Sequence, residues 1–320
     1  MITEFHAKDY GPLKDVHCML TPLHAFIGPN DSGKSTLLRA IVTSVNYFGG
    51  GQKFALGDHF ELSGKIDELP FEVANTRASL YGGILAPDVV ARARQWIQRP
   101  ARVCRFDAEA LRKPSTLIEE QRALEFVTNR GLGLPGVLDL LNNRADDALR
   151  TISSGMTKLF PALARIQLRN ISSSEKRVAA ELVDGTRIDA DTMSEGILYY
   201  LAYACVRALG GGALPAVEEP ETGLHPARIA EVMRILREIS ESGTQVIIAT
   251  HNPLVINELK PSEVSVVTRT REFGTQVNLI SDTPHFEERS KVYALGELWL
   301  SYANGTDEKP LLTGEEGDEA

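Results

Sequence analysis

The sequence predicts an α/β fold in which helices flank a mixed central sheet. Two observations support this class. Residues 23–27 are apolar except for His24, and residues 246–249 are apolar throughout, which is the pattern of strands buried inside a parallel sheet. Between them, apolar residues after Pro226 recur at helical spacing, so strands and helices alternate along the chain.

The first half of the chain is expected to hold one long helix after three short strands. The helix ends near Tyr47, where glycines follow at 49–51. An inserted, mostly helical segment is expected at about 60–165, in which short extended stretches such as 102–106 precede helical ones and prolines divide the pieces. The strands ahead of the first helix are 2–8, 14–20 and 23–27, the first two joined by a turn at Tyr10-Gly11-Pro12.

The second half continues this alternation. A hairpin turn is expected at Asp184-Gly185, and Ser194 is a candidate cap for the helix that follows it. Pro226 suits a first helical turn, and Gly243 ends that helix. A last helix is expected at 291–302. The expected strands are 166–168, 178–182, 214–217, 246–249, 264–267 and 276–280.

Composition places the chain among folded globular proteins. Of its 320 residues, 43% are hydrophobic, which is enough for a sizeable core. The net charge of -9 argues against a surface covered with basic side chains, although it leaves room for a local basic groove. The three cysteines have no C-x-x-C spacing and imply neither a disulfide framework nor a zinc site, so we expect a cytoplasmic protein.

Residues 196–206 carry no charge and raise the question of a membrane segment. Arg207 interrupts the run, which is shorter than the ~20 apolar residues that a span requires. We therefore expect a buried core helix here, and no membrane partner.

The stretch Gly28-Pro29-Asn30-Asp31-Ser32-Gly33-Lys34-Ser35 matches the phosphate-loop pattern G-x-x-x-x-G-K-[ST]. Its glycines let successive backbone N–H groups turn toward an anion, and the dipole of the following helix points at the same place. Lys34 adds a positive charge for phosphate, and the Ser35 hydroxyl is a candidate Mg²⁺ ligand. The sequence therefore predicts that ATP with Mg²⁺ contacts this loop and the adjoining Thr36.

Two later strands end in residues suited to phosphate chemistry. Glu218 and Glu219 close an apolar strand, so one carboxylate can reach Mg²⁺ while the other polarises the water that attacks the γ-phosphate. His251 closes the next apolar strand, where its imidazole can hydrogen-bond the γ-phosphate or that water. Ligands of open parallel sheets gather at the carboxyl ends of the strands, so we expect these side chains to converge.

The segment Met193-Ser194-Glu195-Gly196 offers a further anion site at a helix start. A single nucleotide already held by the phosphate loop does not need it. We therefore expect an ATP-dependent homodimer, in which this segment of one subunit meets the γ-phosphate bound by the other.

Together these segments resemble the Walker A, signature, Walker B with D-loop, and H-loop motifs of ABC-type ATPases. The form Glu218-Glu219-Pro220-Glu221-Thr222-Gly223-Leu224-His225-Pro226 is similar to the branch that contains RecF, the SMC proteins and the OLD-family ATPases, often labelled predicted AAA-type ATPases. The H-loop likeness is carried by Ala249-Thr250-His251-Asn252. The resemblance implies the fold of an ABC-type ATPase head over about residues 1–302, a stand-alone head without the Toprim nuclease module of OLD enzymes.

The resemblance also implies roles for single residues. Lys34 would bind phosphate, and Ser35 and Glu218 would serve Mg²⁺. Glu219 would be the catalytic carboxylate. The remaining roles fall to His251 as γ-phosphate sensor and to Ser194 and Gly196, which would contact the nucleotide of the opposing subunit.

Two departures limit this transfer. Glu218 stands where aspartate is usual, and its longer arm could move the metal. The glutamine of the Q-loop is not placed by any motif, and Gln52 and Gln95 are the candidates.

The resemblance implies a switch in DNA maintenance or in defence against phage and other foreign DNA. Its candidate partners are DNA and an effector such as a nuclease. Two alternatives remain open: the nucleotide-binding subunit of an ABC transporter, and a regulatory ATP-binding module with little turnover. The long interval from Lys34 to Ser194 and the E-E-P-E-x-G-L-H-P form oppose the transporter.

Two charged stretches complete the sequence. Residues 303–320 are expected to form an acidic, disordered tail. A basic stretch could line a groove for nucleic-acid phosphates, but a solvated face balanced by Asp88, Asp107 and Glu109 is the favoured interpretation. Its members are Arg92, Arg94, Arg99, Arg102, Arg105, Arg112 and Lys113.

Overall fold

The computed structural model of the chain describes residues 1–50, 53, 59–74, 77–81, 85–98, 100–119, 126–143, 147–208, 214–270, 274–283 and 286–302. The chain forms two compact units. The first comprises Met1–Val103, Gly212–Pro220 and Ile239–Ala320, and the second comprises Cys104–Gly211 and Glu221–Glu238. The tail expected at 303–320 lies outside the described residues.

A six-stranded mixed sheet forms the centre of the first unit, in the order β15-β14-β3-β13-β12-β7. Strands β14, β3, β13 and β12 run parallel to one another, and β15 is antiparallel to β14. Every residue of β3, β13 and β12 is buried, as their apolar sequences predict, so the expected α/β class with a mixed central sheet is confirmed. The bounds are β3 Leu23–Ile27, β7 Arg102–Cys104, β12 Pro215–Glu218, β13 Val246–Thr250, β14 Val264–Thr270 and β15 Gly274–Leu279.

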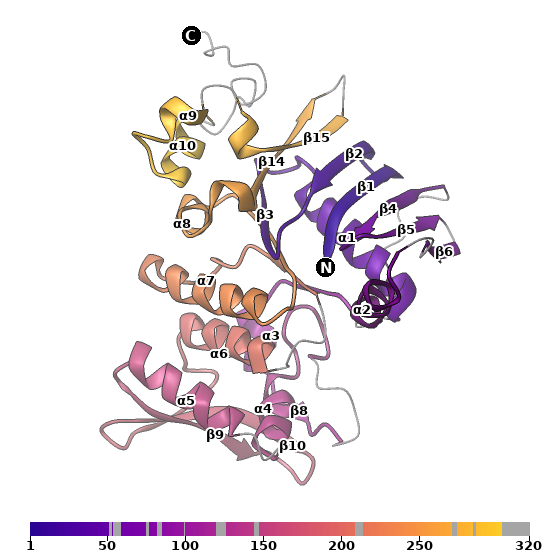
Figure 1. Cartoon of the computed structure of the whole chain (residues 1–320). Helices are drawn as coiled ribbons and strands as arrows, with labels where there is room; N and C mark the ends of the chain where they lie inside the picture. Colours follow the sequence, from indigo (N-terminus) through magenta and orange to yellow (C-terminus); the bar gives the residue numbers. More distant parts are fainter. Residues whose placement is uncertain are drawn as a thin grey trace. The chain divides into compact units, whose positions relative to one another are not determined.

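A second sheet of this unit is antiparallel, in the order β2-β1-β4-β5-β6. Helix α1 packs between the two sheets, against β13 and β12 on one side and against β1, β4 and β5 on the other (Figure 1). Burial of α1 on both sides fixes the direction in which the chain leaves β3. The bounds are β1 Ile2–Tyr10, β2 Leu13–Met19, β4 Glu61–Ile66, β5 Leu69–Ala74, β6 Arg77–Leu80 and α1 Lys34–Gly49.

Strands β4, β5 and β6 fall in the segment at about 60–165 that was expected to be mostly helical. In β5, Leu69, Phe71 and Val73 are buried while the residues between them are half-buried. This period of two is the pattern of a strand with one face on the core. The alternating run is too short to be recognised from the sequence beside nearby prolines.

The remaining elements of the first unit include a helix pair near the C-terminus. Helix α10 begins at Leu295, later than expected, because the Glu297 carboxylate accepts a hydrogen bond from the N–H of Ala294 at 3.1 Å and so defines the first turn. Gly296 lets α10 approach α8, since a Cβ there would lie 2.1 Å from the Pro253 carbonyl oxygen. The bounds are α2 Pro87–Ile97, α8 Pro253–Asn257, η1 Pro261–Glu263, η2 Ile280–Asp282, α9 Phe286–Arg289 and α10 Leu295–Tyr302.

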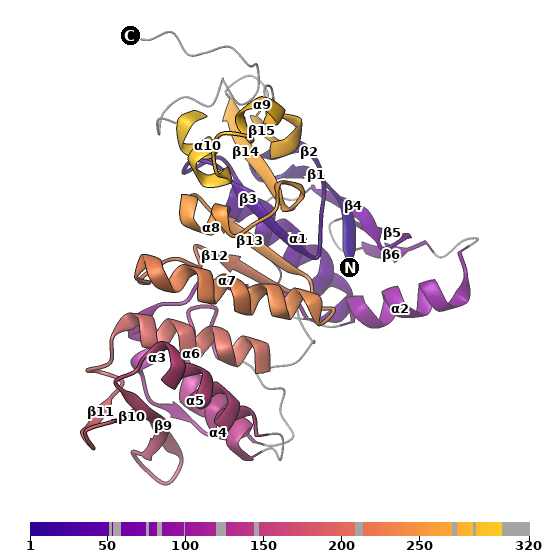
Figure 2. The same cartoon turned by 60° about the vertical axis from the view of Figure 1, so that its left-hand side comes forward.

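The second unit packs helices on an antiparallel sheet in which β10 pairs with β8, β9 and β11. Helices α4 and α5 lie against this sheet, and α6 packs on both helices (Figure 2). The turn expected at Asp184-Gly185 joins β10 to β11. The bounds are α3 Ala108–Arg112, β8 Ser115–Thr116, α4 Leu134–Asn143, α5 Ala148–Leu159, β9 Leu163–Asn170, β10 Glu175–Leu182, β11 Arg187–Asp189, α6 Glu195–Ala208 and α7 Pro226–Glu241.

Helix α6 contains the uncharged run at 196–206. Its residues from Ile197 to Cys205 are all buried, as expected of a core helix. Across the described residues, no helix combines the length and the apolar character that crossing a bilayer requires.

Candidate functional site

The phosphate-loop segment joins β3 to α1 in the first unit. Gly28 follows the last residue of β3, and a Cβ there would lie 2.2 Å from the Val267 carbonyl oxygen. Gly33 stands just before α1 with φ 109°, in the left-handed region that favours glycine. The two glycines therefore allow a tight turn against β14 that side chains would obstruct, which is what a loop closing around phosphate requires.

Lys34 lies over this loop. Its Nζ donates hydrogen bonds to the carbonyl oxygens of Gly28 at 2.7 Å and Pro29 at 2.5 Å. The Thr275 hydroxyl donates to the Ser32 carbonyl oxygen at 3.0 Å and holds the far side of the loop against β15. Ser32 is buried, and its Oγ has no hydrogen-bond partner among the described atoms. A buried hydroxyl of this kind fits a loop built to contact an anion.

The other predicted loop residues are more open to solvent. Asn30, Asp31 and Ser35 are exposed, whereas Pro29 and Thr36 are half-buried. Asp31 has φ 65°, a left-handed conformation that aspartate tolerates better than most residues. The exposed Ser35 hydroxyl, at the first turn of α1, remains accessible to a ligand.

The register of the sheet brings three predicted segments to one edge. Ile27 of β3 pairs with Thr250 of β13, and Ala249 of β13 pairs with Glu218 of β12. The loop that begins at Gly28, the residue His251 and the residue Glu219 therefore follow the carboxyl ends of three neighbouring parallel strands. This is the edge at which open α/β sheets bind ligands.

The two carboxylates at the end of β12 lie in different environments. Glu218 is 4% exposed, whereas the Glu219 side chain is 35% exposed. Glu219 has φ 48°, which is unusual for a residue with a side chain, and its N–H donates to the Ala249 carbonyl oxygen at 2.8 Å. The backbone turn at Glu219 directs its carboxylate toward His251, whose Nδ1 lies 3.8 Å from Oε1.

The segment Met193-Ser194-Glu195-Gly196, called the signature-like segment below, belongs to the second unit. Met193 is buried, Ser194 is exposed, and a Cβ at Gly196 would meet no atom within 4 Å. The Ser194 carbonyl accepts hydrogen bonds from the N–H groups of Ile197 and Leu198, so the first turn of α6 starts from it. Ser194 and Gly196 thus present an open surface at a helix N-terminus.

Three contacts around this segment were not foreseen from the sequence. Arg112 of α3 reaches Met193 and Glu195, and the Tyr199 ring packs where Gly223 has no side chain. The sequence places Arg112 in the basic stretch and favours a solvated face for it, yet its side chain is only 18% exposed. No local pattern distinguishes it from the other arginines of that stretch.

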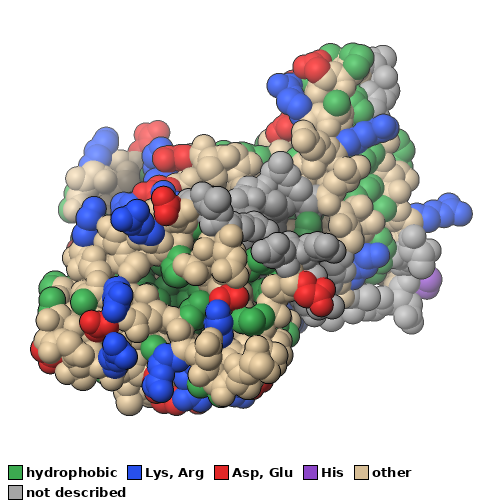
Figure 3. Space-filling model, turned by 90° about the horizontal axis from the view of Figure 1, so that it is seen from below, with side chains coloured by type: hydrophobic (Ala, Val, Ile, Leu, Met, Phe, Trp, Pro, Cys, Tyr) green, Lys and Arg blue, Asp and Glu red, His purple; other side chains and the backbone are tan. Residues whose placement is uncertain are grey.

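The basic stretch is divided between the two units, because its members fall on both sides of the boundary at Val103. Arg92 pairs with Asp88, and Arg112 pairs with Glu109. On the face shown in Figure 3, described Lys and Arg side chains stand next to Asp and Glu side chains. Arg99 and the Q-loop candidate Gln52 lie outside the described residues, and Gln95 is exposed on α2.

Comparison with known proteins places this geometry in context. Residues 106–257 match a family model described as "AAA domain, putative AbiEii toxin, Type IV TA system". No curated protein matches the sequence. Among solved structures, the chain is similar to the SMC head bound to the C-winged helix domain of ScpA, with 18% identity, a TM-score of 0.61, and coverage of 91% of this chain and 99% of that chain.

The chain is also similar to the Smc head domain with an extended coiled coil bound to the C-terminal domain of ScpA derived from Pyrococcus furiosus. That match has 16% identity and a TM-score of 0.58, and it covers 91% of this chain and 98% of that chain. These likenesses show that the chain has the fold of SMC heads, as the resemblance to ABC-type ATPases implies, and the family model matches an AAA domain within it.

Proposed function

The chain has the fold of the ABC-type ATPases of the RecF and SMC branch, and on that premise we propose that it binds ATP with Mg²⁺ and hydrolyses it. The observation that carries the proposal is the shared sheet edge. Gly28, Glu219 and His251 directly follow neighbouring parallel strands, so a phosphate loop, a carboxylate and an imidazole face one place.

Binding falls to the loop and the start of α1. Backbone N–H groups of the loop and the Lys34 ammonium hold the β- and γ-phosphates, and the buried Ser32 hydroxyl is a further donor. Ser35 and Glu218 would hold the metal, which would neutralise charge on the phosphates. Within the described residues no group of three His, Cys, Asp or Glu side chains could hold a metal ion by itself, so Mg²⁺ would bind here together with the phosphates.

Hydrolysis falls to the pair at the ends of β12 and β13. Glu219 orients the attacking water and accepts its proton, because its partly exposed carboxylate stands at the sheet edge. His251 donates a hydrogen bond to the γ-phosphate as charge grows on it. The contact of 3.8 Å between the two side chains supports a shared target.

We also propose that two chains enclose the nucleotides between them. The exposed Ser194 and the open surface at Gly196 would contact the triphosphate bound by the other chain. ATP binding would then close the dimer and hydrolysis would open it, which makes the protein a switch in the cytosol.

The partner is proposed from the comparisons. The family description names a putative toxin of a type IV toxin–antitoxin system, and the similar SMC head is bound to a domain of ScpA. We propose that this chain likewise works with a second protein, in DNA maintenance or in defence against foreign DNA. A nuclease is one such effector, and DNA is a further candidate partner.

The test uses Glu219→Gln, which keeps the shape of the side chain but removes its basicity. We expect ATP binding to persist, phosphate release to slow by roughly 10²-fold or more, and an ATP-dependent dimer to accumulate in sedimentation velocity. Glu241→Gln, at an exposed position, is the control and should behave as wild type. A Glu219→Gln protein that stays monomeric with ATP would rule out the dimer.

Two other functions predict different results. A regulatory module with little turnover would bind ATP but release phosphate slowly in the wild type, with and without DNA. A transporter subunit would co-purify with an integral membrane protein.

A further inference from the structure

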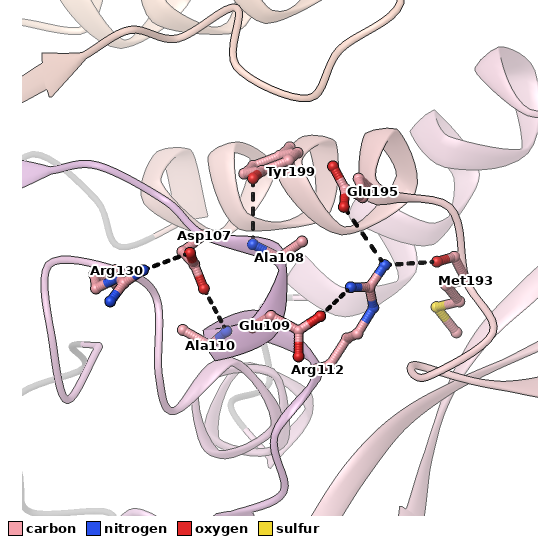
Figure 4. A network of polar contacts seen from close by, with 9 residues as sticks. All are labelled: Asp107, Ala108, Glu109, Ala110, Arg112, Arg130, Met193, Glu195 and Tyr199. Carbon is pink, nitrogen blue, oxygen red and sulfur yellow. Dashed lines mark hydrogen bonds and ion pairs between the residues drawn. The ribbon is translucent and has the colours of Figure 1, made fainter.

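A polar network surrounds the signature-like segment in the second unit (Figure 4). Its centre is Arg112, the last residue of α3. One Nη donates to Oε1 of Glu109 at 2.7 Å, and the other donates to the Met193 carbonyl oxygen at 3.4 Å. The second Nη also lies 4.0 Å from Oε1 of Glu195. One guanidinium therefore contacts the residues on both sides of Ser194.

The guanidinium is held by a well-anchored helix. Asp107 accepts a hydrogen bond from the N–H of Ala110 at 2.9 Å and pairs with Arg130 at 2.6 Å. Burial would raise the pKa of Asp107, but these two partners hold it below its ordinary value. Tyr199 of α6 accepts a hydrogen bond from the N–H of Ala108 at 3.2 Å. Because α3 is capped and hydrogen-bonded to α6, the position of Arg112 is fixed, and Arg112 can hold the signature-like segment in place.

The same helix start packs against the segment after Glu219. Gly223 has φ 69°, and a Cβ there would lie 2.3 Å from Cε2 of Tyr199 and 3.0 Å from Oε2 of Glu195. The carboxylate of Glu195 is thus confined between Gly223 and Arg112. Its side chain is nevertheless 51% exposed, and Glu195 stands between Ser194 and Gly196, whose surface is open.

Glu195 creates an electrostatic problem for the proposed dimer. A carboxylate beside Ser194 and Gly196 would repel the negative charge of a triphosphate that approaches the same surface. Arg112 contacts this carboxylate from the side of α3 and offsets its charge. The hydrogen bond to the Met193 carbonyl at the same time sets the path of the backbone into α6.

We propose that Arg112 is a positioning residue for ATP-dependent dimerisation, which holds the Met193–Glu195 backbone and offsets part of the Glu195 charge where the second chain's nucleotide arrives. This inference rests on the proposed function. It assigns to Arg112 a role beyond holding the fold together, because an ion pair at 4.0 Å with a partner that is 51% exposed contributes little to stability.

The experiment measures dimerisation in the Glu219→Gln background, where hydrolysis does not intervene. Arg112→Ala should weaken the ATP-dependent dimer by about tenfold or more, while the affinity of the monomer for a fluorescent ATP analogue changes by less than about twofold. Adding Glu195→Gln to Arg112→Ala should restore much of the dimer, because the repelling charge is gone. Raising the salt concentration should reduce the difference in dimer affinity between Arg112→Ala and its parent, because salt screens the repulsion.

Two further variants keep the result interpretable. Arg112→Lys retains the charge but not the forked donor geometry, and should weaken the dimer less than Arg112→Ala. Arg92→Ala removes an arginine of the basic stretch that pairs with Asp88 on α2, outside this network, and should leave the dimer unchanged.

Several outcomes would overturn the inference. One is that Arg112→Ala dimerises as well as its parent. Another is that Arg112→Ala loses the dimer and Glu195→Gln does not restore it, which would indicate a purely structural role. A Glu219→Gln parent that never dimerises with ATP refutes the proposed function itself and the inference with it. The parent and the double variant therefore separate the two failures.

Discussion

The Nδ1 atom of His251 lies 3.8 Å from Oε1 of Glu219, across the ends of two neighbouring parallel strands. This distance is too long for a hydrogen bond, and neither side chain is buried: His251 is 52% exposed and Glu219 is 35% exposed. Both can therefore turn toward one target in front of the sheet edge. A water or phosphate oxygen at that place would be contacted by a proton acceptor and a hydrogen-bond donor together.

The first prediction concerns His251→Ala. We expect kcat for ATP hydrolysis to fall by roughly 10²-fold, because a donor to the developing charge is lost, while ATP affinity changes little. Phosphate release and binding of a fluorescent ATP analogue measure the two quantities. His17→Ala is a matched control, since the His17 side chain is 55% exposed and lies on β2. Lost ATP affinity with normal kcat would contradict the assigned role.

A second prediction separates strain from function at Glu219. Its φ of 48° costs about 1 kcal/mol for a residue with a Cβ. Glycine avoids that cost, but it increases the conformational entropy of the unfolded chain, which lowers the free energy of unfolding by a similar amount. We therefore expect Glu219→Gly to change the free energy of unfolding by less than about 1 kcal/mol and to abolish turnover. Urea denaturation measures the stability.

The comparison is Glu231→Gly in the interior of α7, which should lose about 1 kcal/mol because glycine is a poor helix former. If Glu219→Gly lowered the free energy of unfolding more than Glu231→Gly does, the backbone at Glu219 would not be strained as its φ indicates.

The sheet edge could be predicted from the sequence because each of its parts is a local pattern. The strand from Leu23 to Ile27 is apolar except for His24, and the glycines and Lys34 follow it within a few residues. Glu219 and His251 likewise come directly after apolar runs. Since parallel strands of one sheet end at one edge, their convergence needs no knowledge of strand order.

A third prediction tests the phosphate loop. Lys34→Ala should abolish measurable ATP binding in calorimetry, because it removes both the charge for phosphate and the two hydrogen bonds to the Gly28 and Pro29 carbonyls. Lys8→Ala, at an exposed position on β1, should bind as wild type. Retained affinity in Lys34→Ala would remove the loop from the nucleotide site.

Contacts between distant segments could not be predicted in the same way. Arg112 and Met193 are 81 positions apart, and Thr275 and Ser32 are 243 positions apart. Each contact depends on tertiary packing that no periodicity records. Strands β4 to β6 were missed for another reason: they are short, and their period of two competes with breaks at glycine and proline.

A fourth prediction contrasts two glycines. Gly28→Ala should destabilise the protein by roughly 2 kcal/mol and impair ATP binding, because its Cβ would lie 2.2 Å from the Val267 carbonyl oxygen. Gly196→Ala should leave stability unchanged, since its Cβ would meet no atom within 4 Å, but it should weaken the ATP-dependent dimer. Thermal melting and sedimentation distinguish the two. Equal stability losses would contradict the packing described at these positions.

The last prediction concerns pH and His24, which is fully buried in β3. Its Nε2 lies 3.0 Å from Ser265 Oγ and its Nδ1 lies 3.2 Å from Thr21 Oγ1. Burial lowers the pKa of His24 from 6.5 to about 3, although the nearby Glu263 acts in the opposite direction. The folded protein thus keeps this imidazole neutral where the unfolded chain takes up a proton.

Because the unfolded chain binds this proton more readily than the folded protein, the free energy of unfolding falls as the pH falls. Above pH 6.5 neither state binds the proton and the stability is complete, whereas below pH 6.5 proton uptake by the unfolded chain lowers the free energy of unfolding, by up to about 1.4 kcal/mol per pH unit. Urea denaturation between pH 7 and 5 tests this, in a window above the ordinary titration of carboxylates. His24→Gln should flatten the slope, His17→Gln should not, and an unchanged slope in His24→Gln would mean that another group sets the acid sensitivity.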